Sequence, residues 1–122
     1  MIKSWDYKNE YKYLKKDVLN IIDKVLKSGK LFFGKELLQF EKTFLKRNNS
    51  KYGVGVASGT DALYLSLRAL DIGKNDEVIT VANTAIPTIA AIKNTGASVK
   101  FIDVGDDYLI DIKKIEQSIS NK

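Results

Sequence analysis

The sequence contains neither cysteine nor histidine among its 122 residues. Without cysteine, the chain can form no disulfide bond, thiolate nucleophile or Cys/His zinc site of its own. Without histidine, it can hold neither a Ser-His-Asp triad nor an imidazole that moves protons. Any chemistry in this chain must therefore depend on carboxylates, lysines, hydroxyls, backbone amides or a cofactor.

Long apolar runs are also missing, and none approaches the roughly 18 residues that cross a bilayer. The hydrophobic fraction of 44% and the charged fraction of 29% are ordinary for a globular protein. The opening residues 1–16 are polar and aromatic, unlike a signal peptide. We therefore expect a cytoplasmic protein that has its own core and does not enter a membrane.

Arginine is scarce, with only Arg47 and Arg68, although the formal net charge is +5. The lysines are spread along the chain and alternate with acidic residues. No motif combines clustered basic residues with aromatic ones, as nucleic-acid-binding domains do. We therefore expect no nucleic-acid partner.

The first fifty residues have the apolar spacing of two helices. Apolar residues recur every three or four positions over 11–27, which places them on one helical face. Ser28-Gly29 ends this helix, because glycine readily adopts the left-handed cap. A second helix is predicted over 35–46, ended by Asn48-Asn49-Ser50. Residues 1–50 are therefore predicted to be an N-terminal helical segment.

From residue 51 onward, short apolar strands alternate with helices. The predicted strands are 52–57, 77–81 and 98–104, and the predicted helices are 61–70, 86–94 and the stretch from Asp111 to Ser120. This alternation is typical of an α/β fold with a parallel sheet and covering helices. We predict that residues 51–122 form a βαβαβα unit. Three strands leave open edges, so the sheet is expected to be incomplete.

One turn, Ser58-Gly59-Thr60-Asp61, joins a predicted strand to the start of a helix. The first turn of a helix has unpaired N–H groups and partial positive charge, and a glycine there lets an anion approach. Ser58 and Thr60 add hydroxyl donors, so the turn is suited to bind phosphate. On local sequence alone, such a cluster is more often a plain helix N-cap, and both interpretations stay open.

Two nucleotide-binding motifs fit less well. A P-loop requires a Gly-Lys-Ser/Thr ending, which the chain lacks. Gly53, Gly55 and Gly59 nearly match a dinucleotide fingerprint. The first two fall inside a predicted strand, where the tight turn of that motif cannot form.

Several short motifs follow one another in an order that is specific in combination. They are Ser28-Gly29, Phe33-Gly34, Phe40-Glu41, Val54–Leu63, Gly73, Asp76–Ile79, Gly96-Ala97, Phe101–Val104 and Ile115-Glu116. From Ser28 to Ile119 the chain resembles the N-terminal portion of the DegT/DnrJ/EryC1/StrS family of sugar aminotransferases. Members of that family are substantially longer than this chain.

The resemblance implies the N-terminal part of the large domain of a fold-type I transferase that depends on pyridoxal 5'-phosphate (PLP). It implies a mainly parallel sheet, a smaller C-terminal domain and a homodimer with shared active sites. It also implies that PLP is the cofactor, a nucleotide-linked keto-sugar the acceptor and glutamate the amino donor, as in amino-sugar biosynthesis. The Ser58-Gly59-Thr60-Asp61 turn matches the segment that holds the cofactor phosphate, with the N–H groups of Thr60 and Asp61 and the Thr60 hydroxyl as donors.

The chain departs from the family pattern in two respects. Ala85 stands where many members have an aromatic residue stacked on the pyridine ring, although neighbouring Asn83 or Thr84 could contact the cofactor or simply cap a helix. None of the eighteen lysines matches the motif of the Schiff-base lysine, and the acid that pairs with the pyridine nitrogen is also absent. We therefore expect this chain by itself to be inactive, with no catalytic residue of its own.

Two other groups of residues have a structural and a functional interpretation. Asp103, Asp106, Asp107 and Asp111 could suggest a metal site, but their spacing is not that of a calcium loop, and we expect turn and cap roles and no metal. Three aromatic residues could line a substrate pocket, although burial in a core or in a dimer contact is the favoured interpretation; they are Trp5, Phe32 and Phe33.

Two alternatives to an aminotransferase stay open. The chain could be a non-catalytic, truncated remnant, or a partner of a full-length subunit. The parent protein could also be a PLP-dependent sugar dehydratase of the same fold, in which histidine replaces the lysine.

Overall fold

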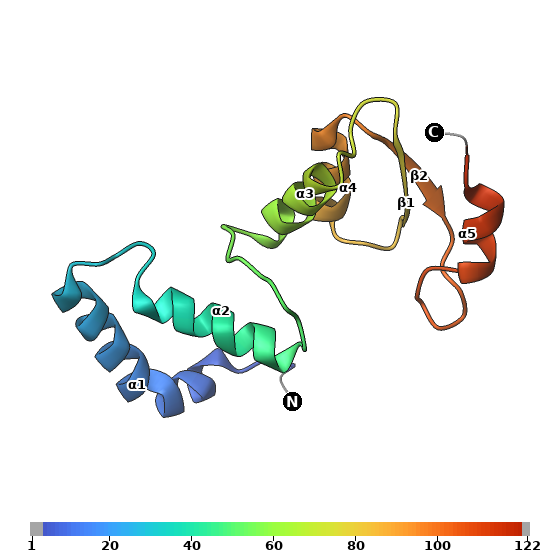
Figure 1. Cartoon of the computed structure of the whole chain (residues 1–122). Coiled ribbons are helices and arrows are strands. Elements are labelled where there is room, and N and C mark those ends of the chain that lie inside the picture. The colour runs from blue at the N-terminus through green and yellow to red at the C-terminus, as the bar shows by residue number, and fades with distance from the viewer. Residues whose placement is uncertain (1–3, 121–122) are drawn as a thin grey trace. The chain divides into compact units, whose positions relative to one another are not determined.

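The structure is a computed structural model that describes residues 4–120. It divides into two compact units, Met1–Gly55 and Val56–Lys122, each described here by itself. The first unit holds two helices, and the second holds three helices and two strands (Figure 1). Over residues 4–120, every helix is too short or too polar to traverse a lipid bilayer.

Helix α1 runs over Tyr7–Ser28 and begins four residues earlier than the apolar spacing predicts. Asp6 causes the earlier start, because its side chain accepts a hydrogen bond from the Asn9 N–H at 3.3 Å and so caps the first turn. At the other end, Gly29 adopts the predicted left-handed conformation with φ of 67°, and its N–H donates to the Leu26 carbonyl.

Helix α2 runs over Lys35–Arg47, as predicted to within one residue. The Asn48 side chain donates to the Phe44 carbonyl at 2.9 Å, and Asn49 takes the left-handed conformation with φ of 53°. The Ser50 N–H then donates to the Leu45 carbonyl, which closes the end of the helix. The predicted break at residues 48–50 is therefore confirmed.

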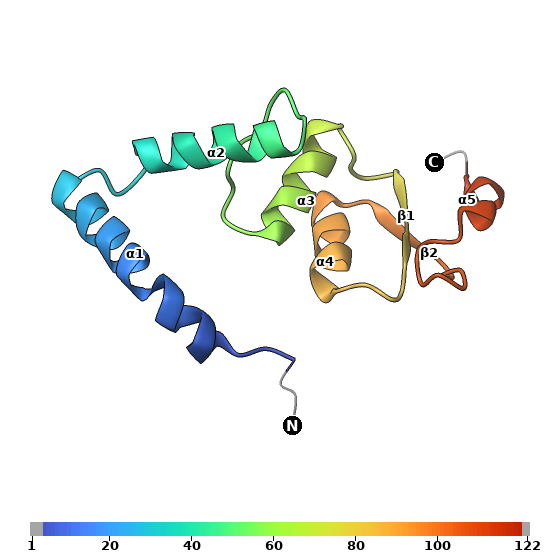
Figure 2. The same ribbon diagram turned by 90° about the horizontal axis from the view of Figure 1, so that it is seen from below.

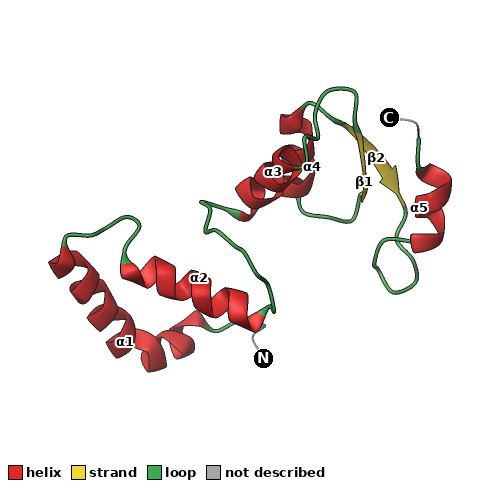
Figure 3. Cartoon of the chain, in the orientation of Figure 1, coloured by secondary structure: helices red, strands yellow, loops and turns green. Residues whose placement is uncertain are grey.

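The strand predicted over 52–57 is wrong, because this segment is a loop (Figure 3). A strand exists through its hydrogen bonds to a neighbouring strand. Among the described residues, the two strands pair only with each other, so 52–57 has no ladder to join. The short apolar sequence of this segment could not show whether a neighbouring strand was present.

In the second unit, helices and strands alternate in the order α3 (Gly59–Ala69), β1 (Glu77–Val81), α4 (Ile86–Thr95), β2 (Ser98–Ile102) and α5 (Ile112–Ser118). The two strands are parallel, and residues 77–81 pair in register with residues 98–102. Helix α4 packs against α3 and β2, whereas α5 contacts β2. In both views α4 and α5 lie on opposite sides of the strand pair (Figures 1 and 2).

The core of the second unit is small and lies where α4 meets β2. Its buried apolar residues are Ala91, Ile92, Ala97 and Ile102. Buried Thr95 is satisfied locally, because its hydroxyl donates to the Ile92 carbonyl at 2.7 Å and accepts from the Ala97 N–H at 3.2 Å. Gly96 then ends α4 in the left-handed conformation, with φ of 91°.

The second strand is shorter than the predicted 98–104, since it ends at Ile102. Val104 instead forms an isolated antiparallel bridge with Ile110, which closes a tight loop. Beyond that loop, the Asp111 side chain accepts from the Lys113 N–H at 3.0 Å and caps α5, as predicted. This helix ends at Ser118, two residues before the predicted end.

Candidate functional site

Two helices of the second unit begin on the same side of the strand pair. The N-terminal ends of α3 and α4 and the carboxyl end of β1 all lie toward the lower side in Figure 2. Ligands of α/β folds bind at this kind of edge, where strands end and helices begin. Four of the five predicted cofactor-binding residues start α3, and the fifth, Ala85, precedes α4.

Ser58 is the N-cap of α3. Its hydroxyl oxygen accepts from the Asp61 N–H at 3.1 Å, and the hydroxyl donates to Asp61 Oδ2 at 2.8 Å. The capping interpretation of the cluster is therefore confirmed. As a consequence, the Ser58 hydroxyl and the Asp61 N–H, both expected to face a phosphate, already have partners within the turn.

Three donors of the same turn have no partner among residues 4–120: the Gly59 N–H, the Thr60 N–H and the Thr60 hydroxyl. A Cβ atom added to Gly59 would meet nothing within 4 Å, so the side of Gly59 where a side chain would lie is open. Unpaired N–H groups at a helix start suit a phosphate. The residues present therefore fit the phosphate group of a cofactor.

The negative charge of the Asp61 carboxylate would partly repel a phosphate bound at this turn. It lies in the first turn of α3 and already complements the partial positive charge of the helix end. A phosphate bound at Gly59 and Thr60 would share that charge with a neighbouring anion. The hydrogen bond from Ser58 holds the carboxylate within the turn at 2.8 Å.

Ala85 precedes the first turn of α4 and is exposed to solvent. Its methyl group has no ring face, so it cannot provide the aromatic stacking found at this position in many family members. Beside it, the hydroxyl groups of Thr84 and Thr88 form a hydrogen bond of 2.9 Å. Thr84 thus tethers the start of α4, whereas Asn83 is exposed.

The four aspartates considered as metal ligands do not form one cluster, and they make different local contacts. Asp103 pairs with Lys114 at 3.3 Å, Asp107 accepts from the Leu109 N–H at 3.0 Å, and Asp111 caps α5. Throughout residues 4–120, no three acidic side chains converge on a point that could hold a metal ion. The expected cap role of Asp111 is confirmed, and Asp106 and Asp107 lie in the expected turn.

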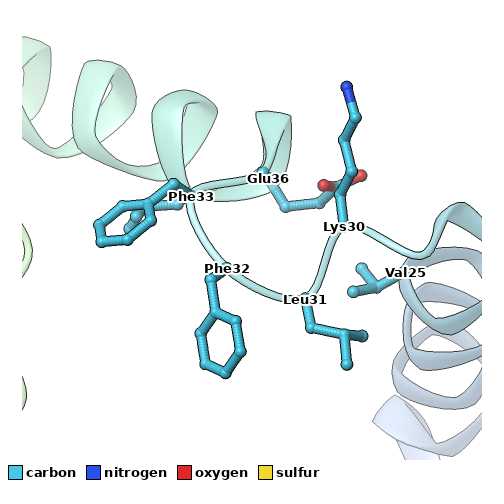
Figure 4. A pocket seen from close by; sticks show the side chains of 8 residues that line it. Val25, Lys30, Leu31, Phe32, Phe33 and Glu36 are labelled. Atoms are coloured by element: carbon cyan, nitrogen blue, oxygen red, sulfur yellow. The ribbon is translucent and has the colours of Figure 1, made fainter.

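The three aromatic residues considered for a pocket are exposed, so burial in a core, one of the two favoured alternatives, is wrong for them. Trp5 is 73% exposed, Phe32 83% and Phe33 89%. Phe32 and Phe33 line a pocket of about 330 Å³ in the α1–α2 loop, together with Val25, Lys30, Leu31, Gly34, Glu36 and Leu37 (Figure 4). Their contact with a partner subunit stays a prediction.

One contact was missed by the sequence analysis. A carboxylate oxygen of Glu41, on α2, accepts a hydrogen bond from the Gly55 N–H at 2.7 Å. The two residues are fourteen positions apart, so helical and strand periodicity carry no signal for the contact. The motifs Phe40-Glu41 and Val54–Leu63 contain both partners, but their pairing could not be read from either motif.

The parallel α/β unit and the open helix start are features of PLP-dependent transferases. The family profile of the DegT/DnrJ/EryC1/StrS aminotransferases matches residues 12–122. The chain therefore belongs to this family, and the resemblance seen in its motifs is confirmed.

Known relatives agree with this assignment. The chain is 39% identical over 117 residues to the dTDP-3-amino-3,4,6-trideoxy-alpha-D-glucose transaminase of Micromonospora megalomicea subsp. nigra, covering 95% of this chain and 31% of the relative. It superposes on the crystal structure of S. venezuelae DesV with a TM-score of 0.91 and 37% identity, covering 95% of this chain and 32% of that one. The predicted fold class, an incomplete part of the PLP-dependent transferase large domain, is thereby confirmed.

A third relative carries out different chemistry. The crystal structure of the E. coli GDP-4-keto-6-deoxy-D-mannose-3-dehydratase with bound hydrated PLP matches with a TM-score of 0.73 and 30% identity. This match covers 98% of the chain and 30% of the dehydratase. The chain thus spans about a third of the length of the relatives it matches.

Proposed function

We propose that this chain provides the phosphate-binding turn of a PLP-dependent aminotransferase that acts on a nucleotide-linked keto-sugar, with glutamate as amino donor. The observation that carries the proposal is the set of three free donors at Gly59 and Thr60 in a chain of this family. The transaminase identified among its relatives supports the sugar substrate.

In this proposal, the residues of the turn have distinct tasks. The N–H groups of Gly59 and Thr60 and the Thr60 hydroxyl bind the phosphate, and the open side of Gly59 admits it. The hydrogen bonds between Ser58 and Asp61 hold the turn in shape. When bound, PLP supplies an electron sink for amino-group transfer. Ala85 would offer the cofactor ring no aromatic face for stacking.

The remaining parts of the proposal concern the whole protein. We propose a homodimer in the cytoplasm, involved in amino-sugar biosynthesis. No lysine in this chain matches the Schiff-base motif, so the chain by itself is proposed to lack turnover.

A binding experiment tests the turn directly. Pyridoxine 5'-phosphate has the phosphate and ring of the cofactor but no aldehyde, so it cannot react with the eighteen lysines. Titrated into the ¹⁵N-labelled chain, it should shift the amide signals of Gly59 and Thr60 first. The variant Thr60→Val loses one hydrogen-bond donor and should weaken binding by about three- to tenfold.

Thr43→Val is the matched control, because its hydroxyl bonds only within α2, to the Gln39 carbonyl and side chain. It should bind as tightly as the unmodified chain. Shifts confined to lysine-rich helices, with none at Gly59 and Thr60, would contradict the proposal.

The sugar dehydratase is the second candidate, favoured by the E. coli relative. The coding DNA beyond the codon for Lys122 separates the two. A lysine at the Schiff-base position of the family pattern supports the aminotransferase, whereas a histidine there supports the dehydratase. An immediate stop codon supports a non-catalytic remnant or a partner subunit, and co-purification with a full-length homologue then identifies the partner.

A further inference from the structure

The C-terminal end of α5 is held by a side chain from another element of the second unit. The Lys100 ammonium group, on β2, donates a hydrogen bond to the Ser118 carbonyl at 2.6 Å. Ser118 is the last residue of α5, and the last carbonyls of a helix have no partner within the helix. A lysine at this place also complements the partial negative charge of the helix end. Lys100 therefore caps a helix to which it does not belong.

Lys100 is in turn held by the first strand of the pair. Its Nζ atom lies 3.7 Å from Glu77 Oε1, and the side chains of Lys100 and Glu77 are 36% and 18% exposed. The same Glu77 oxygen accepts a hydrogen bond from the Ser120 hydroxyl at 2.9 Å. Glu77 pairs in register with Ser98, two residues before Lys100, so Glu77 and Lys100 share one face of the strand pair. We define the latch as Glu77, Lys100, Ser118 and Ser120.

The other attachment of α5 is more open to solvent. The helix has seven residues, none of them buried, and a helix this short is marginal without tertiary contacts. At its N-terminal end, Lys114 forms ion pairs with Asp103 at 3.3 Å and with Asp111 at 3.6 Å. The Lys114 side chain is 46% exposed and that of Asp103 is 86% exposed, so their attraction contributes little. The latch is therefore the more shielded of the two attachments.

We propose that α5 is a strap that opens as a unit, and that Lys100 is the residue that keeps it closed. The hinge is the loop of residues 103–111, which leads into α5 and is closed by the bridge between Val104 and Ile110. The buried residues of the second unit lie where α4 meets β2, outside the strap. Segments with few buried contacts open at a lower free energy than the core, so α5 can leave the strands while the core stays closed. This inference concerns the second unit alone and goes beyond the proposed phosphate binding.

The test is amide hydrogen exchange on the full 122-residue chain, compared between α5 and the strand pair. Lys100→Met keeps an apolar stem but removes the ammonium group, and it should speed exchange of the Gln117 and Ser118 amides by about tenfold. The amides of residues 78–81 and 99–102 should stay within about twofold of their rates in the unmodified chain. Lys100→Arg keeps a cationic donor and should restore most of the protection of α5.

Two further variants make the test specific. Lys93→Met is the matched control, because it makes the same replacement at an exposed lysine of α4, and it should leave α5 exchange unchanged. Ser120→Ala removes only the hydroxyl that donates to Glu77 and should speed α5 exchange by about two- to threefold. This milder variant replaces Lys100→Met in the test if Lys100→Met does not fold.

Each outcome decides a separate point. Unchanged α5 exchange in Lys100→Met would overturn the latch, as would a failure of Lys100→Arg to restore protection. Equal acceleration in α5 and in the strands would overturn the separate opening of the strap. If only Ser120→Ala folds, unchanged α5 exchange in that variant would overturn the latch, whereas faster exchange confined to α5 would support it.

Discussion

The two units of the chain are stabilised in different ways. The second unit joins a strand pair and three helices around buried residues of α4 and β2. In the first unit, no described residue is buried, and α1 and α2 make few contacts with each other. Tertiary packing therefore stabilises the second unit, whereas caps, local hydrogen bonds and the contact of Gly55 with Glu41 stabilise the first.

This difference matches the distribution of apolar residues. Both helices of the first unit are amphipathic, but their apolar faces are exposed; examples are Leu19 and Ile22 on α1 and Phe40 and Phe44 on α2. Exposed apolar faces of this extent are typical of surfaces that another part of a protein or a partner covers. The second unit has a core of its own, so local opening should be rarer there.

The largest expected effect comes from removing the centre of that core. Ile92 is 3% exposed, and Ile92→Ala should cost about 2–5 kcal/mol of unfolding free energy through lost burial and a cavity. Hydrogen exchange should show β1 and β2 amides losing protection, while α1 and α2 amides keep theirs. Equal losses in both units would show that they unfold together and would break the comparison.

Ile86→Ala is the matched control on the same helix. Ile86 is 83% exposed, so its truncation removes little buried surface. The control should leave the protection of the β1 and β2 amides nearly unchanged.

A pair of glycines sharpens the comparison, because each unit ends a helix with a left-handed glycine. Alanine in this conformation costs about 1–2 kcal/mol at either position. At Gly96 φ is 91°, farther from the left-handed minimum near 57° than the 67° of Gly29, so alanine is more strained at Gly96. Gly96→Ala should therefore destabilise the second unit by more than Gly29→Ala destabilises α1, as measured by hydrogen exchange of each helix.

Equal costs for these two substitutions would contradict the difference in backbone conformation between the two caps. Lys93→Ala and Lys24→Ala, one exposed lysine on each of the two helices, provide a baseline for changes at exposed helical positions. Neither should reproduce the glycine effects.

These features also show what sequence can predict. The caps at Gly29 and Asp111 and the strand 77–81 were predicted correctly, because each is set by residues close in the chain. The strand predicted over 52–57 failed for the opposite reason. Whether an extended segment becomes a strand depends on a distant partner, which periodicity does not identify.

The candidate site was predictable to the same degree. The sequence located the turn at 58–61 and its helix start, since both are local. The sequence could not show which donors of the turn are already paired, because the hydrogen bonds between Ser58 and Asp61 depend on side-chain conformation. The contact of Glu41 with Gly55 joins two motifs across a loop and needed the structure.

A smaller effect tests how closely residues 53–55 pack against α2 in the first unit. Gly53→Ala places a Cβ 2.8 Å from Leu45 Cδ2, at the tip of a side chain that can move. We expect a cost of about 1 kcal/mol, the low end for overpacking. Leu45→Ala removes the obstructing methyl groups, so the double variant should be more stable than the sum of the single effects predicts.

The measurement is a double-mutant cycle on the exchange of the Gly55 amide. Strictly additive costs would show that Gly53 and Leu45 do not meet, and the first unit would then lose its main tertiary contact. Gln39→Ala is the control, because Gln39 lies on the same helix but is exposed and does not face Gly53. Its effect should be additive with that of Gly53→Ala.

The smallest expected effect concerns the ion pair between Lys27 and Asp23 on α1, which are 2.8 Å apart and exposed by 76% and 62%. Asp23→Asn should lower the stability of α1 by about 0.3–0.5 kcal/mol, as for other helical pairs four residues apart. The difference should vanish in about 1 M salt, because screening removes the attraction between exposed charges. Asp17→Asn, which removes from the same helix a carboxylate that has no ion pair within residues 4–120, is the control for circular dichroism measurements. A contrary result would be a loss of α1 stability in Asp23→Asn that is several times larger than about 0.5 kcal/mol and persists in salt. It would show that α1 is stabilised by packing against other parts of the protein and not only locally.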